Sequence, residues 1–145
     1  MDESEARRRF AAARVARLAT VTADGAPHLV PIVFAIEDDV VYSSVDAKPK
    51  RTSNLRRLAN IGAEPRVTVL VDEYDERWER LWWVRADGRA EVIHDGPLRE
   101  RALGALRDKY PQYREEAQHR EEPQPAGVAV VIRVDRLRWW SASGD

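Results

Sequence analysis

Alternating polar and apolar residues around tight turns limit the fold of this chain more than any other feature. Residues 17–22 read RLATVT, and an Asp24-Gly25 pair separates them from a second run over 27–36. Alternation with a period of two predicts strands with one buried face, and Asp-Gly supplies the positive φ of a hairpin turn. Pro31 cannot donate a ladder hydrogen bond, so we place the second strand at a sheet edge or a bulge. The chain therefore contains an antiparallel hairpin near its start.

The same pattern returns along the chain. It predicts strands at 40–45, 66–72, 81–86 with a continuation over 89–93, and 127–140. Helices are predicted at 4–16, capped by Ser4, after Thr52 or Ser53, and from Pro97. The apolar side of the second helix is predicted to consist of Leu55, Leu58 and Ala59. We expect one domain over 1–145, with a helix at 4–16, a barrel over 17–95, a helical segment at 97–119 and a closing strand at 127–140. About six strands and two or three helices predict a mainly β fold, an antiparallel β-barrel with peripheral helices.

The composition excludes several classes of function. The chain has no cysteine and three scattered histidines, so we expect no disulfide, no thiolate chemistry and no metal site. A net charge of −1 argues against a general nucleic-acid or membrane partner. Neither a signal peptide nor a membrane-spanning run is evident, and we expect a cytoplasmic protein.

A cationic segment follows the strand at 40–45. Residues 46–57 carry five cations and one anion, a charge of +4, which leaves −5 for the rest of a chain whose net charge is −1. A strand end that leads through a cationic loop into a helix N-terminus suits an anion such as phosphate. A solvated basic loop is the alternative interpretation. No glycine-rich dinucleotide fingerprint or Walker loop is present, which excludes those explanations of an anion site.

Aromatic residues and one histidine are further candidates. Tyr74, Trp78, Trp82 and Trp83 lie close together in the sequence, and Trp82 and Trp83 point to opposite faces of a strand. One of them can stack on a planar cofactor, although plain packing or a dimer interface explains them equally well. His28 is a candidate proton donor, with an incidental histidine as the alternative.

Several stretches, in this order, resemble the pyridoxamine 5'-phosphate oxidase-like (PPOX class) split β-barrel superfamily. They are RLATVT, DGAPHLVPIVF, VVYSSVD, KPKRTSNLRRLANI and EPRVTVLVD. The tract VDEYDERWERLWWVRADGRA is similar to an actinobacterial branch of coenzyme F420-dependent oxidoreductases, and the resemblance covers roughly residues 5–140. It implies a split β-barrel like that of FMN-binding proteins, and a homodimer with two cofactor sites at its interface.

The resemblance also implies which residues bind the cofactor. Its phosphate and tail would be held by Ser44, Lys48, Lys50, Arg51, Thr52 and Asn54, of which Lys50 and Arg51 are the strongest candidates. Its ring would lie over the second strand, at His28, Val30 and Pro31. The partner subunit would contribute Trp78, Trp82 or Arg85.

The expected function is transfer of a hydride between reduced F420, a deazaflavin, and an unsaturated small molecule. The proton donor is water, His28 or Tyr74. One alternative is an FMN-binding flavin reductase or oxidase on the same fold. Another is a non-catalytic carrier or sensor that binds F420, flavin or haem. Pyridoxamine oxidation is disfavoured because the arginine-rich substrate pocket and the longer C-terminal extension of those relatives are missing.

Overall fold

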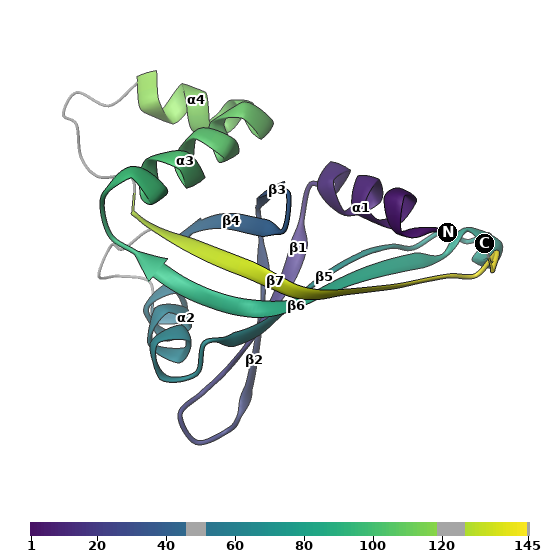
Figure 1. Ribbon diagram of the computed structural model, residues 1–145, viewed down its shortest axis with the longest axis horizontal. Coiled ribbons are helices and arrows are strands. Elements are labelled where there is room, and N and C mark those ends of the chain that lie inside the picture. The colour runs from purple at the N-terminus through teal and green to yellow at the C-terminus, as the bar shows by residue number, and fades with distance from the viewer. Residues whose placement is uncertain (46–51, 119–126, 145) are drawn as a thin grey trace.

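A computed structural model of the protein describes residues 1–45, 52–118 and 127–144 (Figure 1). Its elements, in chain order, are α1 (Glu3–Ala12), β1 (Ala16–Val21), β2 (Pro27–Ile32), β3 (Ala35–Glu37), β4 (Val40–Val45), α2 (Thr52–Ala63), β5 (Arg66–Glu73), the 3₁₀ turn η1 (Trp78–Arg80), β6 (Trp82–Ile93), α3 (Pro97–Lys109), α4 (Pro111–Gln118) and β7 (Val128–Ser141).

One antiparallel sheet contains all seven described strands, in the order β2-β1-β5-β6-β7-β4-β3. Its two edge strands, β2 and β3, are joined by residues 33–34 alone, so the sheet must curl until its edges approach each other. The mainly β, antiparallel prediction is confirmed, as is the place of Pro31 on an edge strand. The run at 27–36 forms two strands where the sequence predicted one, which gives seven strands in place of about six.

Inward-facing side chains of the curled sheet form the main core. Leu18, Val69, Val84 and Ile132, from four different strands, are fully buried. Phe34, in the link between the edge strands, packs edge-to-face against Phe10 of α1 with ring centroids 5.2 Å apart. The break between β2 and β3 therefore brings an aromatic side chain into the core.

The first helix is shorter than the predicted 4–16. It ends at Ala12, and Ala13 is extended, with ψ of 142°, because the chain must turn into β1. Its N-cap is Asp2 and not Ser4, since the Asp2 carboxylate accepts a hydrogen bond from the Glu5 backbone N–H at 2.8 Å.

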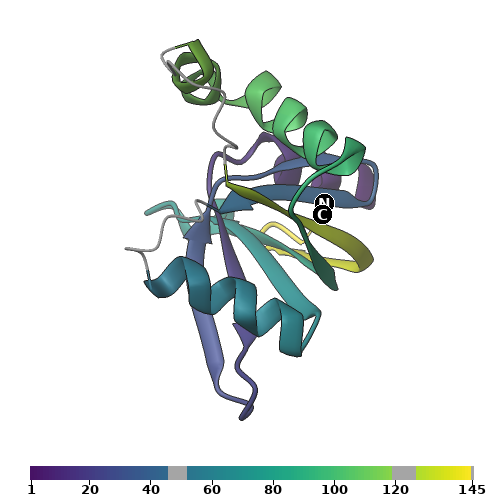
Figure 2. The same ribbon diagram turned by 90° about the vertical axis from the view of Figure 1, so that its left-hand side faces the viewer.

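The helices surround the sheet on several sides. Helices α1 and α2 lie at opposite ends of it, while α3 packs against β3, β4 and β7 (Figures 1 and 2). Four α-helices are described, more than the two or three expected, because the predicted helical segment at 97–119 contains two of them, α3 and α4. None of the helices in the described part of the chain is long and apolar enough to cross a membrane. The α2 end is the part that the sequence assigned to cofactor binding.

Candidate functional site

Helix α2 turns an unusual face toward the sheet. Among its described side chains, residues 55–63, the buried ones are Arg57, Asn60 and Ile61, spaced so that all three share one side of the helix. Asn60 donates from Nδ2 to the hydroxyl of Thr20 on β1 at 3.1 Å, and both residues are buried. This bond joins polar groups inside the fold and sets the rotation of the helix.

The sequence predicted a different buried face for this helix, formed by Leu55, Leu58 and Ala59. That prediction is wrong for two of them: Leu55 is 43% exposed and Ala59 is exposed, whereas Leu58 is half-buried. The physical reason is the hydrogen bond between Asn60 and Thr20, because a polar group that is buried needs a hydrogen-bond partner inside the protein. A pattern of apolar residues alone does not contain that constraint.

Arg57 is the most unusual residue of the site. Only 8% of it is exposed, its Nε has no hydrogen-bond partner, and no ion pair joins it to a carboxylate among the described residues. Burial lowers the pKa of its guanidinium. Removing a cation from water is costly unless an anion or a set of acceptors compensates it. Arg57 is thus buried and has an unused donor, two properties that suit a residue that binds an anionic ligand.

His28 lies on the same side of the β1–β2 hairpin. It is the register partner of Thr20, and residues directly opposite each other in an antiparallel pair share a face. The side chain is half-buried, and its Nδ1 is buried without a hydrogen-bond partner. We call His28, Thr20, Arg57 and Asn60 the α2 polar cluster. Two of its buried polar atoms, Arg57 Nε and His28 Nδ1, have no hydrogen-bond partner, and a ligand with acceptor and donor groups could supply one to each.

The predicted ring-binding residues of β2 divide between two faces. His28 and Val30 alternate with exposed residues and face the core side, as does Ile32. Pro31 is exposed on the opposite face, where Leu29 is 67% exposed. The side chains at 28–31 therefore do not form one surface, although the backbone of β2 is shared by both faces.

Ser44 lies away from the α2 polar cluster. Its Oγ is 2.8 Å from the hydroxyl of Tyr113 on α4, and it points to the face of β4 opposite Ser43 and Val45. Ser43 is buried and donates to the carbonyl of Val33 at 2.8 Å.

Five of the predicted cofactor contacts cannot be placed. Lys48, Lys50 and Arg51 lie outside the described residues, as do the side chains of Thr52 and Asn54. These assignments stay predictions.

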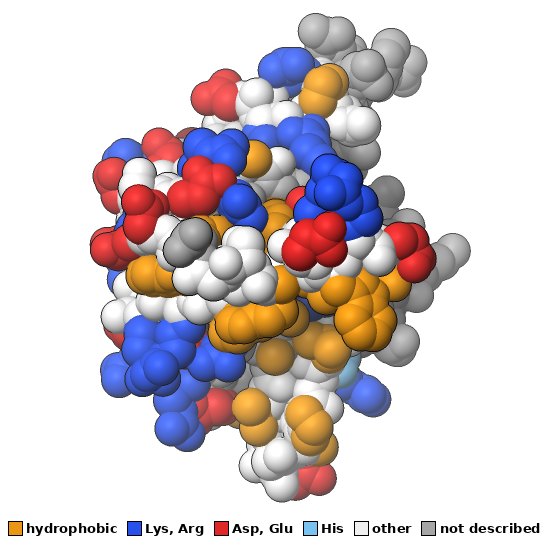
Figure 3. Space-filling model, turned by 90° about the vertical axis from the view of Figure 1, so that its right-hand side faces the viewer, with side chains coloured by type: hydrophobic (Ala, Val, Ile, Leu, Met, Phe, Trp, Pro, Cys, Tyr) orange, Lys and Arg blue, Asp and Glu red, His pale blue; other side chains and the backbone are white. Residues whose placement is uncertain are grey.

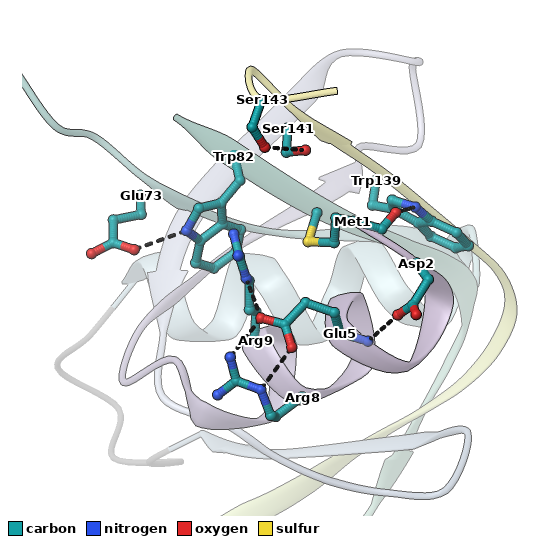
Figure 4. A network of polar contacts seen from close by, with 10 residues as sticks. All are labelled: Met1, Asp2, Glu5, Arg8, Arg9, Glu73, Trp82, Trp139, Ser141 and Ser143. Carbon is teal, nitrogen blue, oxygen red and sulfur yellow. Dashed lines mark hydrogen bonds and ion pairs between the residues drawn. The ribbon is translucent and has the colours of Figure 1, made fainter. Parts of the chain in front are cut away.

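Trp82 holds the N-terminal helix in place (Figure 4). Its indole Nε1 donates to a carboxylate oxygen of Glu73 at 2.8 Å, and the Arg9 guanidinium lies 5.3 Å from the ring centroid. Arg9 in turn donates to Glu5 at 2.8 Å. Within its own chain, Trp82 therefore has a packing role.

Arg85 and Trp82 lie on opposite faces of β6, because their positions differ by three and side chains alternate along a strand. Arg85 is half-buried, with its guanidinium 5.8 Å from the ring centroid of Trp83 and its Nε 3.5 Å from Asp87. These two predicted contacts cannot reach one ligand from the same face of one strand.

The segment between β5 and β6 carries two exposed aromatic side chains, Tyr74 at 64% and Trp78 at 67% exposure. We call residues 74–80 the aromatic arm. Leu81 accepts a backbone hydrogen bond from Ala142, so the arm lies beside the C-terminal residues, and Figure 1 shows α2 at the opposite end of the long axis. One chain therefore does not bring Trp78 to the α2 polar cluster.

A cavity of about 840 Å³ opens near the start of β5, between the β1–β2 turn and the middle of β6. Asp87 in its wall accepts a hydrogen bond from the Thr68 hydroxyl at 2.8 Å and lies 3.6 Å from Arg136. Its charged groups are paired with one another, in contrast to the α2 polar cluster.

The sequence did not single out Arg57 by itself, and Asn60 and Tyr113 were missed. The available signal was the spacing of Arg57, Asn60 and Ile61, which places two polar residues on the side of the helix that also carries an isoleucine. No comparable pattern pointed to Tyr113.

Comparisons with known proteins agree with this architecture. The family model described as pyridoxamine 5'-phosphate oxidase matches residues 3–141. No curated protein matches the chain.

Solved structures that resemble the chain come from several bacteria. A conserved hypothetical protein from Mycobacterium tuberculosis is 24% identical, with a TM-score of 0.76 over 98% of this chain and 86% of that one. An FAD-binding protein from Mesorhizobium loti is 25% identical, with a TM-score of 0.68 over 96% and 94% of the two chains. A haem-binding protein from Mycobacterium smegmatis is 21% identical, with a TM-score of 0.73 over 97% of this chain and 53% of that one.

The family match spans nearly the whole chain, and the seven strands follow the fold of these neighbours. This chain therefore belongs to the pyridoxamine 5'-phosphate oxidase family.

Proposed function

We propose that the protein binds coenzyme F420 and transfers a hydride between the reduced cofactor and an unsaturated small molecule. The observation that carries the proposal is Arg57, a buried guanidinium with an unpartnered Nε at the α2 end. Membership of a family named for an oxidase supports a redox role. When bound, a reduced deazaflavin supplies a hydride from its ring carbon C5.

Arg57 would hold an anionic or carbonyl group of the cofactor. No carboxylate among the described residues pairs with its charge, and a phosphate or ring carbonyl would accept the hydrogen bond that Nε does not make. The helix that carries it begins within the segment of residues 46–57, whose charge of +4 includes Arg57 itself. The charges of that segment would attract an anion, and Arg57 would bind part of it in a dry environment.

His28 would act on the same ligand from the opposite strand. Its buried, unpartnered Nδ1 can accept or donate one hydrogen bond, depending on the tautomer. Hydride addition to an unsaturated bond requires a proton at the neighbouring atom. His28, Tyr74 of a second copy, or water would supply that proton.

We further propose that the protein is a homodimer in which the aromatic arm of one copy reaches the α2 end of the other. Trp78 and Tyr74 on the arm are exposed, and so is Trp140, which is 46% exposed. Figure 3 shows hydrophobic side chains in a band across this end of the molecule, with basic side chains on both sides. Because arm and α2 lie far apart in one chain, only a second copy can join them.

A flavin is the second candidate ligand. The FAD-binding protein from Mesorhizobium loti, at 25% identity over 96% of this chain, favours a flavin reductase or oxidase that uses FMN. A non-catalytic carrier or sensor is a third possibility, supported by the haem-binding neighbour from Mycobacterium smegmatis. The role proposed for Arg57 is the same with any anionic cofactor.

Titration of the purified protein tests the proposal. F420, FMN and haem would each be added while quenching of the five tryptophans is followed. We expect binding of F420 in the micromolar range or tighter, followed by turnover across a panel of unsaturated acceptors. FMN binding with turnover would favour the flavin enzyme, and tight binding without turnover would favour the carrier.

A matched pair of variants tests Arg57. R57M should weaken cofactor binding about ten- to a hundredfold, the value of a hydrogen bond to a charged group. R56M removes the exposed neighbouring cation and should change the affinity less than about twofold. R57M should also leave the unfolding free energy of the free protein unchanged or raised, because it removes a buried charge that no described carboxylate pairs with. Equal affinities for R57M and R56M would contradict the proposed role.

A further inference from the structure

The outer face of β6 and β7 carries four side chains that the proposed function does not bring together. Arg85 lies directly opposite Arg138 in the register of the two strands, and Trp83 lies directly opposite Trp140. Opposite residues share a face, as do residues two positions apart along a strand, so all four point the same way. Val84, between them on β6, is fully buried in the core, which places the four on the outer face. We call them the outer-face quartet.

Solvent reaches the outer-face quartet. Trp140 is 46% exposed, the Arg85 side chain is 38% exposed, and Arg138 is exposed. Helix α3 packs on the same face of β7 at Ala129 and Val131, near the other end of the strand. In Figure 1 the stretch of β6 and β7 that carries the quartet extends toward the chain ends, away from α2. A ligand can therefore approach the four side chains from outside the fold.

The two arginines face each other without an anion between them. Like charges directly opposite each other in a sheet are destabilising, and Arg138 has no hydrogen bond or ion pair with any described residue. The Nε of Arg85 is buried without a hydrogen-bond partner, although a carboxylate oxygen of Asp87 lies 3.5 Å away. Asp87 also lies 3.6 Å from Arg136 and accepts a hydrogen bond from Thr68. Three arginines against one carboxylate leave a charge of +2 beside the tryptophans.

The spacing of the quartet selects the shape of the anion. The arginine pair and the tryptophan pair are two residues apart along each strand, a distance of about 7 Å. A guanidinium binds a carboxylate through two parallel hydrogen bonds, and an indole offers its face to an aromatic ring. A carboxylate can lie in the plane of the ring that carries it, so an aromatic carboxylate can extend flat from one pair to the other.

We infer that the outer-face quartet binds a planar aromatic carboxylate, with the carboxylate on the two arginines and the ring on the two tryptophans. The bound anion would remove the repulsion between Arg85 and Arg138. The site consists of residues of one copy and needs no cofactor, so the inference stands apart from the proposed function.

Calorimetric titration of the full chain, without added cofactor, tests the site with a matched pair of ligands. The compound 2-naphthoate has a carboxylate on a fused ring, whereas 2-naphthamide has nearly the same shape without the charge. We expect one 2-naphthoate per chain, bound about tenfold more tightly than 2-naphthamide or better, because hydrogen bonds between charged groups are the stronger ones. Acetate, which has no ring, should also bind more weakly than 2-naphthoate.

Matched variants separate the quartet from the general charge of the sheet. R138M should weaken 2-naphthoate binding about tenfold or more. R133M is its control, because Arg133 is exposed on the same strand and also lies opposite an arginine, Arg89, with no tryptophan two positions away on either strand. It should change the affinity less than about twofold. W140L should weaken binding about three- to tenfold, and W78L on the aromatic arm should leave it unchanged.

The outcomes decide between this site and other uses of the two arginines. Equal binding of 2-naphthoate and 2-naphthamide, or equal effects of R138M and R133M, would overturn the inference. Light scattering on the same samples measures the number of copies in the assembly. If R138M changes that number and leaves the affinity for 2-naphthoate unchanged, the arginine pair serves a contact between copies and the inference fails. Binding of 2-naphthoate by a protein that binds neither F420 nor FMN would support the inference while the proposed function fails.

Discussion

The ammonium nitrogen of Lys109 lies 3.9 Å from the centroid of the Phe34 ring. It also donates to the carbonyl of Ala13, so it joins the end of α3 to the end of α1 and to the link between β2 and β3. Burial and, to a lesser extent, the nearby charge of Arg14 lower the pKa of this lysine to about 8.

The lowered pKa of Lys109 predicts a stability that rises with pH. In the unfolded chain the lysine keeps a pKa near 10.5, so above about pH 8 the unfolded state binds more protons than the folded state. The unfolding free energy should therefore increase between about pH 8 and 10. Denaturant titrations at pH 8, 9 and 10 measure it, and K109M should lose this increase. A K109M profile with the same slope as wild type would contradict the assignment.

Glu5 predicts a loss of stability at low pH. Hydrogen bonds from Arg8 and then Arg9 lower the pKa of its carboxyl to about 2, from 4.5. The stabilisation is present above about pH 4.5 and is lost as the pH falls toward 2. In E5Q this acid-dependent loss of stability should be smaller. Tryptophan fluorescence can follow unfolding here, because Arg9, a hydrogen-bond partner of Glu5, also stacks on Trp82. E3Q, on the exposed pair with Arg7, is the control and should unfold like the wild type.

Gly88 predicts a strong steric effect in the sheet. The register of β6 and β7 shifts between Asp87 and Gly88, and a Cβ at position 88 would meet the backbone carbonyl of Arg133 inside van der Waals contact. Because backbone cannot move aside cheaply, G88A should lower the unfolding free energy by about 2 kcal/mol or more. Thermal melts and denaturant titrations measure the loss.

Gly104 on α3 is the matched control for this substitution. Apart from the adjoining backbone of its own helix and its two chain neighbours, no heavy atom lies within 4 Å of a Cβ built there. G104A should raise the unfolding free energy by roughly 0.5–1 kcal/mol. A G88A protein as stable as G104A would show that the sheet can absorb the added methyl group.

The strands could be predicted because their signals are local. Alternation gave β1, β4, β5 and β7 within a residue or two, and Pro31 placed β2 at an edge because a missing N–H forbids a central position. The division of 27–36 into two strands depends on Phe34 meeting Phe10, a contact across the fold that no local pattern contains.

The site was predictable only at the level of its charge. The cationic segment marked the α2 end, yet the burial of Arg57 follows from a helix rotation set by Asn60 and Thr20, forty residues apart in the sequence. Ser44 was selected as a ligand contact, and the sequence could not show that its hydroxyl meets Tyr113. Which side chains of different helices and strands become partners depends on tertiary packing, and residue type and spacing in the sequence do not determine that packing.

The two chain ends lie side by side next to the aromatic arm, in both ribbon views. The indole of Trp139 donates to the carbonyl of Met1 at 2.9 Å, which ties the first residue to the last strand. A bulky fusion or fluorescent label at either end would therefore crowd the arm and leave the α2 polar cluster of its own chain open. Labelling at a terminus becomes a probe of assembly: lost cofactor affinity would report a site completed by a neighbouring copy.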